Sequence, residues 1–454
     1  MHQQKKYLSL RQQYRTFHYE GFTVSPSKKA ILVTYHFHIA DTYHFHPTIR
    51  FNTREHLPSS PHKALLENLF FHIGLAEMIS YWKITCAPRI IVHPARLDDW
   101  QKSWWKDLLF NGLGEFFYRN KITVDPTDFV TIEADGSSSF QATPVENLHG
   151  YLVPIGGGKD SAVTLELLKE QGASPFALNP RKAQYDTVRA AGIAEEALIT
   201  VSRTLDPLIL QLNEEGFLNG HTPFSALLAF ISLPVALLEG KRHIALSNES
   251  SANESTVKQS HVNHQYSKSL AFEEHFRSYV TRYITPDLRY FSMLRPLSEL
   301  QIGALFSGFT AHHEVFRSCN VGSKTNSWCG ACPKCLFTYL VLSLFLPQQQ
   351  VIHIIGTPML EHAPMLKITE ELAGLWPSKP FECVGTSEEV TLALHHLIRK
   401  FDGQELPLVL AQIKEKLPPA PLSLGSYLTK YDNHHHLSKE EFAILNRALH
   451  ALHP

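Results

Sequence analysis

A glycine-rich loop is the segment of this 454-residue chain whose residue types point most directly to chemistry. It reads Pro154-Ile155-Gly156-Gly157-Gly158-Lys159-Asp160-Ser161, between a short apolar segment and a helical pattern. Glycines let a backbone turn with positive φ and bring its N–H groups close to an anion, while the start of the next helix adds partial positive charge. The loop therefore predicts a phosphate site in which Lys159 neutralises phosphate directly. The alternative is a glycine-rich turn without a ligand.

The loop matches neither of two common phosphate motifs. A Walker A loop needs glycine at Val153 and Ser or Thr at Asp160, and the dinucleotide fingerprint needs a third glycine at Ser161. The loop instead resembles the SGGxDS motif of the PP-loop ATP pyrophosphatases, with Gly156 in place of the leading serine. That resemblance implies that ATP is split to AMP and pyrophosphate while a substrate oxygen is adenylated. It also implies that the β,γ-pyrophosphate binds to Gly156, Gly157, Gly158, Lys159 and Ser161.

A second chemical cluster consists of four cysteines within seventeen positions, namely Cys319, Cys329, Cys332 and Cys335. Four soft ligands favour tetrahedral Zn²⁺, and four protein ligands leave no open position for chemistry, which is typical of a structural site. An iron–sulfur cluster is the rival, because four thiolates serve either metal. Unligated buried cysteines are the remaining alternative. The spacing resembles the zinc site of the cyano-deazaguanine synthases, which are also PP-loop enzymes.

Polar residues follow the predicted strand at 243–246, where open α/β sheets bind their ligands. We expect Asn248 and Glu249 to meet nucleotide or magnesium, with Asn253 and Glu254 close to the same site; the alternative is a polar loop that caps a helix. Asp160 either binds Mg²⁺ through water or caps its own helix.

The elements that must position these motifs form, by prediction, a doubly wound parallel α/β sheet. Strands and helices alternate from residue 148, with strands expected at 151–154, 175–178, 198–201, 243–246 and 290–294 and helices at 160–171, 181–191, 205–213 and 224–238. Before it, the alternating residues 30–51 predict an antiparallel hairpin, and residues 63–82 predict a helix. After it, helices are expected at 388–400, 406–416 and 439–452. The predicted domains are 1–147 (α+β), 148–349 (PP-loop α/β) and 350–454 (helical).

Several stretches resemble the MurL family of ATP-dependent UDP-N-acetylmuramoyl-L-alanyl-L-glutamate epimerases. The resemblance spans roughly residues 28 to 400, and the stretches that carry it are residues 74–83, 110–117, 247–254, 316–322 and 381–386. It implies inversion of the terminal L-Glu of UDP-MurNAc-L-Ala-L-Glu to D-Glu, with Mg²⁺-ATP converted to AMP and pyrophosphate.

Inversion at carbon needs a proton acceptor on one face and a donor on the other. The candidates by residue type are His261, His264, Tyr266, Cys86 and Cys383. The predicted catalytic set is Lys159, Asp160, Glu249 and His261. A further alternative is a metal site on the four histidines of the predicted hairpin, which are His36, His38, His44 and His46. Alternate polar positions on a strand normally face water, however.

Composition sets limits on partners. With 42 Lys+Arg against 43 Asp+Glu, the chain has no global field to attract nucleic acid. The longest apolar run, at 224–238, is too short to span a bilayer, and the polar start carries no secretion signal, so we expect a cytoplasmic enzyme with a small-molecule substrate and no membrane partner. No signal for an oligomeric state is present. The rivals are a PP-loop adenylating enzyme of tRNA or deazapurine modification and a non-enzymatic nucleotide-binding regulator.

Overall fold

Each of the two units of the structure is assembled from several separate stretches of the chain. The computed structural model describes residues 2–52, 62–134, 136–260, 262–420 and 422–452. Unit 1 consists of residues 1–150, 200–244 and 261–289, and unit 2 consists of residues 151–199, 245–260 and 290–454. The protein is an α/β protein with a helical C-terminal region. The division into three consecutive domains stays a prediction.

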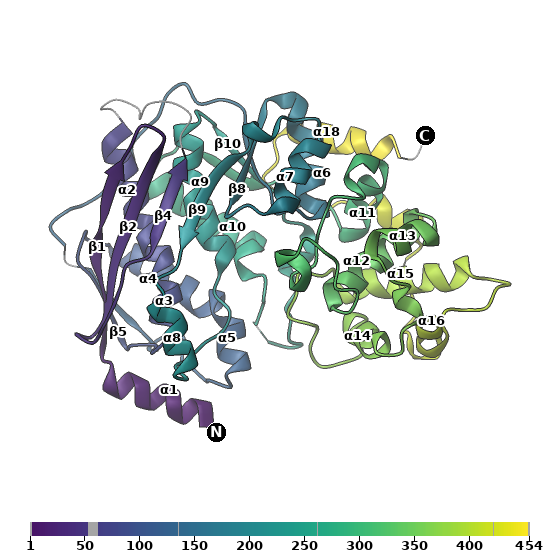
Figure 1. The fold of residues 1–454 in the computed structure, drawn as a ribbon, viewed down its shortest axis with the longest axis horizontal. Helices are drawn as coiled ribbons and strands as arrows, with labels where there is room; N and C mark the ends of the chain where they lie inside the picture. The colour runs from purple at the N-terminus through teal and green to yellow at the C-terminus, as the bar shows by residue number, and fades with distance from the viewer. Residues whose placement is uncertain (1, 53–61, 135, 261, 421, 453–454) are drawn as a thin grey trace. The chain divides into compact units, whose positions relative to one another are not determined.

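Unit 1 contains a mixed sheet with the strand order β9-β4-β2-β1-β5-β6, and β3 pairs with β2. The predicted antiparallel hairpin is confirmed, because β2 pairs with both β3 and β4 in antiparallel register. Strand β9, which we expected in a parallel arrangement, also has an antiparallel neighbour in β4. In Figure 1 the long strands β1, β2 and β4 lie side by side. The strands are β1 Thr16–Pro26, β2 Ala30–Ile39, β3 Tyr43–Phe45, β4 Thr48–Asn52, β5 Arg89–Val92, β6 Thr131–Glu133 and β9 Ile199–Thr204.

The helices of unit 1 bury apolar faces against this sheet and against one another. The predicted helix at 63–82 is confirmed as α2 and α3, and α2 packs against β1 and α9. The apolar run at 224–238 forms α9, whose Pro234 lies inside the helix. Within the described ranges, no helix combines the length and apolarity needed to cross a membrane. The helices are α1 His2–Gln13, α2 Lys63–Glu77, α3 Ile79–Trp82, α4 Asp99–Gly112, α5 Gly114–Arg119, α8 Leu208–Glu214, α9 Phe224–Leu238 and α10 Leu270–Tyr283.

Unit 2 begins with the strand, loop and helix that the glycine motif predicted. Strands β7 and β8 pair in parallel, and the strand order is β11-β10-β7-β8. Helix α6 follows β7 directly and packs against α11 and α18. The predicted strands and helices between 151 and 191 are confirmed within a few residues. Their bounds are β7 Tyr151–Pro154, α6 Lys159–Leu168, β8 Ala173–Leu178, α7 Lys182–Ala190, β10 His243–Leu246 and β11 Arg289–Ser292.

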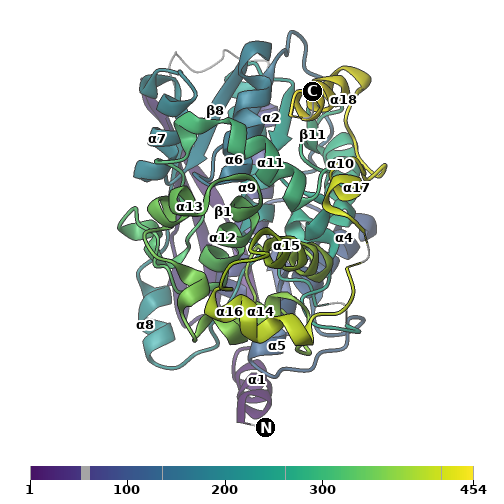
Figure 2. The same cartoon turned by 90° about the vertical axis from the view of Figure 1, so that its right-hand side faces the viewer.

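The remainder of unit 2 is helical, and α12 is its centre. This helix is almost entirely buried and packs against α11, α13, α14 and α15, which lie around it in Figure 2. Helices α11 and α15 both begin with a capping box, at Ser298 and Thr386 respectively. The helices are α11 Glu299–Gly308, α12 Pro333–Phe345, α13 Gln348–Ile355, α14 Met365–Leu372, α15 Ser387–Lys400, α16 Leu408–Ile413, α17 Leu424–Leu428 and α18 Lys439–His450.

Candidate functional site

The glycine loop turns sharply between β7 and α6 in unit 2. Gly157 has φ +84°, and a Cβ atom at this position would lie 2.9 Å from the Cβ of Ala183. Both the left-handed backbone and the close approach therefore require glycine here. The carbonyl of Gly157 accepts a hydrogen bond of 2.7 Å from the backbone N–H of Arg317. The loop is thus fixed from two sides.

Ser161 holds the loop closed from the first turn of α6. Its hydroxyl accepts a hydrogen bond of 3.2 Å from the N–H of Gly156 and donates one of 3.1 Å to the carbonyl of Gly158. A Cβ atom on Gly156 would meet nothing within 4 Å. The backbone at Gly156 therefore has room for the serine that the related motif carries at this position.

The ammonium group of Lys159 is buried between two carboxylates. It forms ion pairs with Asp160 and with Glu299, and its side chain is 4% exposed. Burial opposes the charge, but Asp160 and Glu299 outweigh burial and raise the pKa of Lys159 above its usual range. Lys159 therefore stays protonated, and its positive charge is balanced within the protein.

Three carboxylates come together beside this lysine from three separate elements. Oxygen atoms of Asp160, Glu249 and Glu299 all lie within 4.8 Å of one another. A fourth carboxylate, Glu389, accepts a hydrogen bond of 2.6 Å from the N–H of Glu299. Burial raises the pKa of Glu299, and the neighbouring carboxylates raise it further while Lys159 opposes them. Four carboxylates thus lie close together beside this lysine, and two of them form ion pairs with it.

Two polar side chains fix the strand ends next to the carboxylates. Arg295 is fully buried and donates a hydrogen bond of 2.7 Å to the carbonyl of Glu249. Asn248 donates one of 3.0 Å to the hydroxyl of Ser292, at the end of β11. Glu254, which we expected near this site, forms an ion pair with Lys379.

The structure therefore brings the predicted residues Asp160 and Glu249 together and adds three that sequence reasoning missed. Glu299 and Glu389 lie at the starts of helices, where their local signal is that of a first-turn carboxylate or a capping box. Arg295 precedes Pro296 in an apolar stretch and carries no motif. None of these signals indicates which distant residues meet in space.

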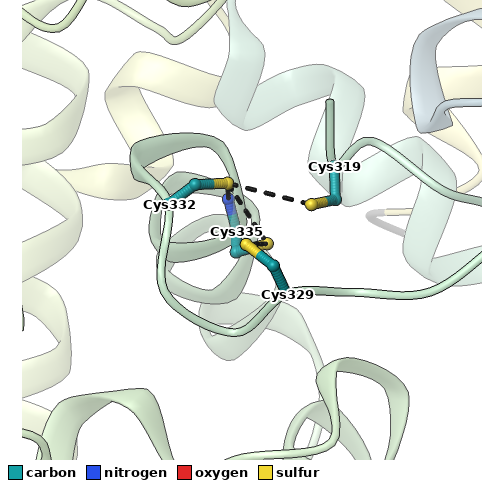
Figure 3. Close-up of side chains that lie close together, drawn as sticks. All are labelled: Cys319, Cys329, Cys332 and Cys335. Carbon is teal, nitrogen blue, oxygen red and sulfur yellow. Dashed lines mark hydrogen bonds between the residues drawn. The ribbon is translucent and has the colours of Figure 1, made fainter. Parts of the chain in front are cut away.

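The four predicted cysteines converge in unit 2, as Figure 3 shows. Their sulfur atoms all lie within 4.8 Å of one another, and the Sγ of Cys332 is 3.4 Å from that of Cys335 and 3.9 Å from that of Cys319. A tetrahedron of sulfurs around Zn²⁺ has edges of about 3.8 Å, from Zn–S bonds of about 2.3 Å. All four are free thiols. The cluster therefore has the donor set and spacing for one structural metal ion such as Zn²⁺.

Local backbone features shape this cysteine cluster. Cys332 is the N-cap of α12, and its sulfur accepts the N–H of Cys335 at 3.4 Å. A Cβ atom on Gly322 would lie 2.0 Å from the carbonyl of Ser327, so only glycine fits there. The neighbouring side chain of Cys335 lowers the pKa of Cys332 to about 5. A thiolate is the form in which cysteine binds metal.

Among the proton-transfer candidates, His264 has a carboxylate partner in unit 1. Its Nδ1 lies 2.5 Å from Oε2 of Glu115, and the Nδ1 of His221 lies 3.3 Å from the same oxygen. Burial opposes the charge of Glu115, but His264, His221 and Arg119 lower its pKa. Burial also lowers the pKa of His221, to about 4. Sequence reasoning named His264 and missed its two partners, although Glu115 lies in a stretch that resembles the family.

The other proton-transfer candidates have varied surroundings. The hydroxyl of Tyr266 donates a hydrogen bond of 2.5 Å to Asp107, and burial raises the pKa of Tyr266. Cys86 is fully buried, and burial raises the pKa of its thiol. Cys383 is half-buried. His261 lies outside the described residues.

The hairpin histidines form pairs. The Nδ1 atoms of His36 and His46 are 3.0 Å apart, and the rings of His38 and His44 are 5.3 Å apart. These four side chains therefore form two separate pairs and do not gather into the single metal site that was predicted for them. His38 turns toward Glu20 on β1.

Comparison with known proteins identifies the family. The family model described as MurL N-terminal domain matches residues 9–293, and the model described as MurL C-terminal domain matches residues 315–423. Three curated relatives are each named UDP-N-acetyl-alpha-D-muramoyl-L-alanyl-L-glutamate epimerase. The protein of Xanthomonas oryzae is 34% identical over 358 residues, which is 76% of this chain and 78% of the relative. The proteins of Micromonospora and Salinispora tropica are 33% and 32% identical, and each match covers 78% of this chain and about four-fifths of the relative. The chain belongs to the MurL family.

Proposed function

We propose that this protein is an amino-acid epimerase that inverts the terminal L-Glu of UDP-MurNAc-L-Ala-L-Glu in peptidoglycan precursor synthesis. The observation that carries the proposal is the family match over both the N-terminal and C-terminal models, together with three relatives that bear this epimerase name. The substrate is a soluble UDP-linked precursor, and we place the enzyme in the cytoplasm for that reason. The same matches favour this function over modification of tRNA or a deazapurine.

The reaction is proposed to consume ATP, because a terminal carboxylate opposes removal of the neighbouring α-proton. In the first step, a carboxylate oxygen of the terminal glutamate attacks the α-phosphorus of ATP, and pyrophosphate leaves. The resulting acyl-adenylate has a carbonyl that can hold the charge of an enolate once a base has removed the α-proton. Return of a proton to the opposite face and attack of water on the acyl carbon then release the D-Glu product and AMP.

The loop in unit 2 is proposed to bind the β,γ-pyrophosphate of ATP. Gly156, Gly157 and Gly158 lie at the N-terminus of α6, where backbone N–H groups and the helix dipole favour anions. Ser161 holds that loop in its closed turn. Lys159 is proposed to supply positive charge beside the phosphates, although its ammonium is paired with Asp160 and Glu299 in the structure. Asn248 is proposed to contact the nucleotide from the end of β10.

The three carboxylates fit Mg²⁺, since the ion prefers oxygen ligands and is commonly held by carboxylates together with substrate phosphates. Asp160, Glu249 and Glu299 supply such oxygens within 4.8 Å of one another. Burial and then the neighbouring carboxylates raise the pKa of Glu299, and a divalent cation would relieve the repulsion between the carboxylates. Bound Mg²⁺ would supply charge stabilisation for the departing pyrophosphate.

The four-cysteine cluster is proposed to hold a structural Zn²⁺. The short Sγ–Sγ separations favour a single ion over an iron–sulfur cluster, whose thiolates sit on different irons and lie farther apart. Four protein ligands leave no position for substrate, so this ion would stabilise the turn that carries residues 319–335.

Proton transfer is proposed to involve a histidine in the segment 261–264. His261 is the residue expected from the sequence, and His264 has the geometry of a general base whose ring is oriented by the carboxylate of Glu115. Replacing each histidine with asparagine distinguishes the two candidates. The variant that lacks the proton-transfer group should still adenylate the substrate but should no longer exchange its α-proton.

The direct test offers the purified protein UDP-MurNAc-L-Ala-L-Glu, ATP and Mg²⁺, and measures both AMP release and the configuration of the product glutamate. We expect D-Glu in the product and AMP only in the presence of this substrate. Bulk tRNA serves as the matched control and should release no AMP. Inversion without ATP consumption would support the epimerase activity and refute the adenylation step. AMP release with tRNA alone would refute the epimerase activity.

A further inference from the structure

Three histidines and one carboxylate converge on the polar face of the sheet in unit 1. His18 and Glu20 lie on β1, His38 lies directly opposite His18 on β2, and His93 follows the end of β5. The parallel pairing of β1 with β5 continues into a hydrogen bond of 3.0 Å from the N–H of His93 to the carbonyl of Tyr19. Strands β1 and β2 and the residue that follows β5 thus place these side chains.

An irregularity in β1 positions the carboxylate. Tyr19 pairs with Phe37 and Gly21 pairs with His36, so Glu20 is the extra residue of a β-bulge. Bulges re-aim a side chain relative to the regular pleat and are common beside functional sites. Oε1 of Glu20 lies 2.8 Å from Nε2 of His38, 3.2 Å from Nε2 of His93 and 3.8 Å from Nδ1 of His18. One oxygen is therefore the meeting point of three imidazole nitrogens.

The tautomer of His38 is fixed by the backbone behind it. Its Nδ1 contacts the carbonyl of Ala40, which only accepts, so Nδ1 carries the proton. Ala40 adopts φ +45°, an unusual conformation for a residue with a Cβ atom. A neutral His38 then directs the lone pair of Nε2 at the carboxylate of Glu20. Backbone carbonyls orient metal-binding histidines in this way.

Two lone pairs that face each other at 2.8 Å need either a proton or a metal ion between them. The rings of His18 and His38 are stacked, with 4.2 Å between their centroids and an angle of 10° between their planes. Nδ1 of His18 is also only 3.0 Å from Nε2 of His93. A single cation between His18, Glu20 and His38 would satisfy all three of these ligands together.

We propose that His18, Glu20 and His38, whose ligand atoms all lie within 4.8 Å of one another, form a binding site for one divalent transition-metal ion of the Zn²⁺ class, separate from the four-cysteine cluster. Nitrogen and carboxylate donors suit Zn²⁺, Ni²⁺ and Cu²⁺. Zn–N and Zn–O bonds of about 2.0 to 2.1 Å place two ligand atoms of a tetrahedron about 3.3 Å apart, and Oε1 of Glu20 lies 2.8 Å from Nε2 of His38 and 3.8 Å from Nδ1 of His18. Glu20 and His93 are 45% and 42% exposed, so an ion reaches the site from solvent. The ion would hold β1 and β2 together.

The test counts metal equivalents in the full-length protein. Zn²⁺ is titrated against a chromophoric chelator into the wild type, Glu20→Gln and His18→Asn, with circular dichroism as a check that each variant is folded. His36→Ala is the matched control, because His36 lies on the same face of β2 but pairs with His46. We expect the wild type and the control to bind one more equivalent than either variant, whose affinity at this site falls more than about 100-fold.

A second readout covers the case in which a variant fails to fold. Glu20→Gln keeps the shape of a half-exposed ligand, and Zn²⁺ should raise the melting temperature of the wild type by more than that of this variant. Equal stoichiometry and equal metal-dependent melting in the wild type and all ligand variants would overturn the proposal. Loss of the extra equivalent in His36→Ala would overturn it as well, because binding would then belong to the histidine-rich face at large.

Discussion

Lys159 and Glu299 form an ion pair in which each side chain is only 4% exposed. The two residues are 140 positions apart in the chain, and the pair joins the start of α6 to the start of α11. Asp160 contacts the same ammonium, and Glu249 lies close to both carboxylates. The buried charge in unit 2 is therefore concentrated beside the glycine loop.

Removing one member of this ion pair should destabilise the protein. Glu299→Gln keeps the shape of the side chain but leaves the buried ammonium of Lys159 with Asp160 alone. We expect the free energy of unfolding, measured by urea denaturation, to fall by about 3 kcal/mol. Glu133→Gln is the matched control, since Glu133 pairs with an exposed arginine, and it should change little. Equal effects of the two substitutions would contradict the buried pair.

The glycine loop should tolerate a side chain at one position and reject it at the next. Gly156→Ser has open space for its Cβ atom and restores the hydroxyl of the related motif, so nucleotide affinity should be retained or increased. Gly157→Ala meets Ala183 at 2.9 Å and requires φ +84°, so stability should fall by at least about 1 kcal/mol and nucleotide binding should be lost. Calorimetric titration with ATP measures the nucleotide affinity of both variants, and urea denaturation measures their stability. A Gly157→Ala protein that binds ATP as the wild type does would refute this account of the loop.

Loss of one cysteine ligand should release the metal. We expect Cys335→Ser to lower the zinc content of the purified protein by one equivalent, with a lower melting temperature. Cys383→Ser removes a half-buried thiol outside the cluster and should leave the zinc content unchanged. A zinc content in Cys335→Ser equal to that of the wild type, or iron and labile sulfide in the wild type, would show that the cluster holds something else.

Lys83 predicts a pH dependence of stability. Burial lowers the pKa of Lys83 from 10.5 to about 8 in the folded protein. Between pH 8 and pH 10.5 the unfolded chain binds more protons than the folded chain, so the free energy of unfolding should rise with pH across this window. Below pH 8 the folded protein carries the full cost of burying the charged ammonium of Lys83. This cost lowers the free energy of unfolding by about 1.4 kcal/mol for each unit of the pKa shift.

Lys83→Met removes this penalty, so the variant should be more stable than the wild type at pH 7 and should lack the rise above pH 8. Substitution of the exposed Lys5 by Met is the control and should keep the rise. Urea denaturation at several pH values measures the slope. A wild-type protein whose stability falls from pH 8 to pH 10 while the Lys83→Met curve runs parallel to it would contradict the assignment.

Local sequence patterns predicted the elements whose signals are short in range. The turn between β7 and α6 follows from three glycines, and the hairpin of β2 and β3 follows from alternation between apolar and polar side chains. The cysteine cluster was predictable because its spacing already places the last three thiols around the start of α12. In each case the residues that interact lie within about twenty positions of one another.

The contacts that escaped prediction join residues that are far apart in the chain. Glu299 meets Lys159 because α11 packs against α6, and no local pattern encodes that packing. The antiparallel pairing of β4 with β9 likewise joins residues about 150 positions apart. His18 was missed because its partner His38 is set by strand register. Sheet register and helix packing are decided by burial over the whole unit.

The most direct test of the central claim follows the α-proton of the substrate. The protein is incubated with UDP-MurNAc-L-Ala-L-Glu and Mg²⁺ in deuterated water, with and without ATP, and the α-carbon of the glutamate is examined by mass spectrometry and NMR. We predict D-Glu that carries deuterium at the α-carbon only when ATP is present, with one AMP formed for each inversion. Inverted product in the absence of ATP, or AMP formation by active protein with no deuterium at the α-carbon, would contradict ATP-driven epimerisation.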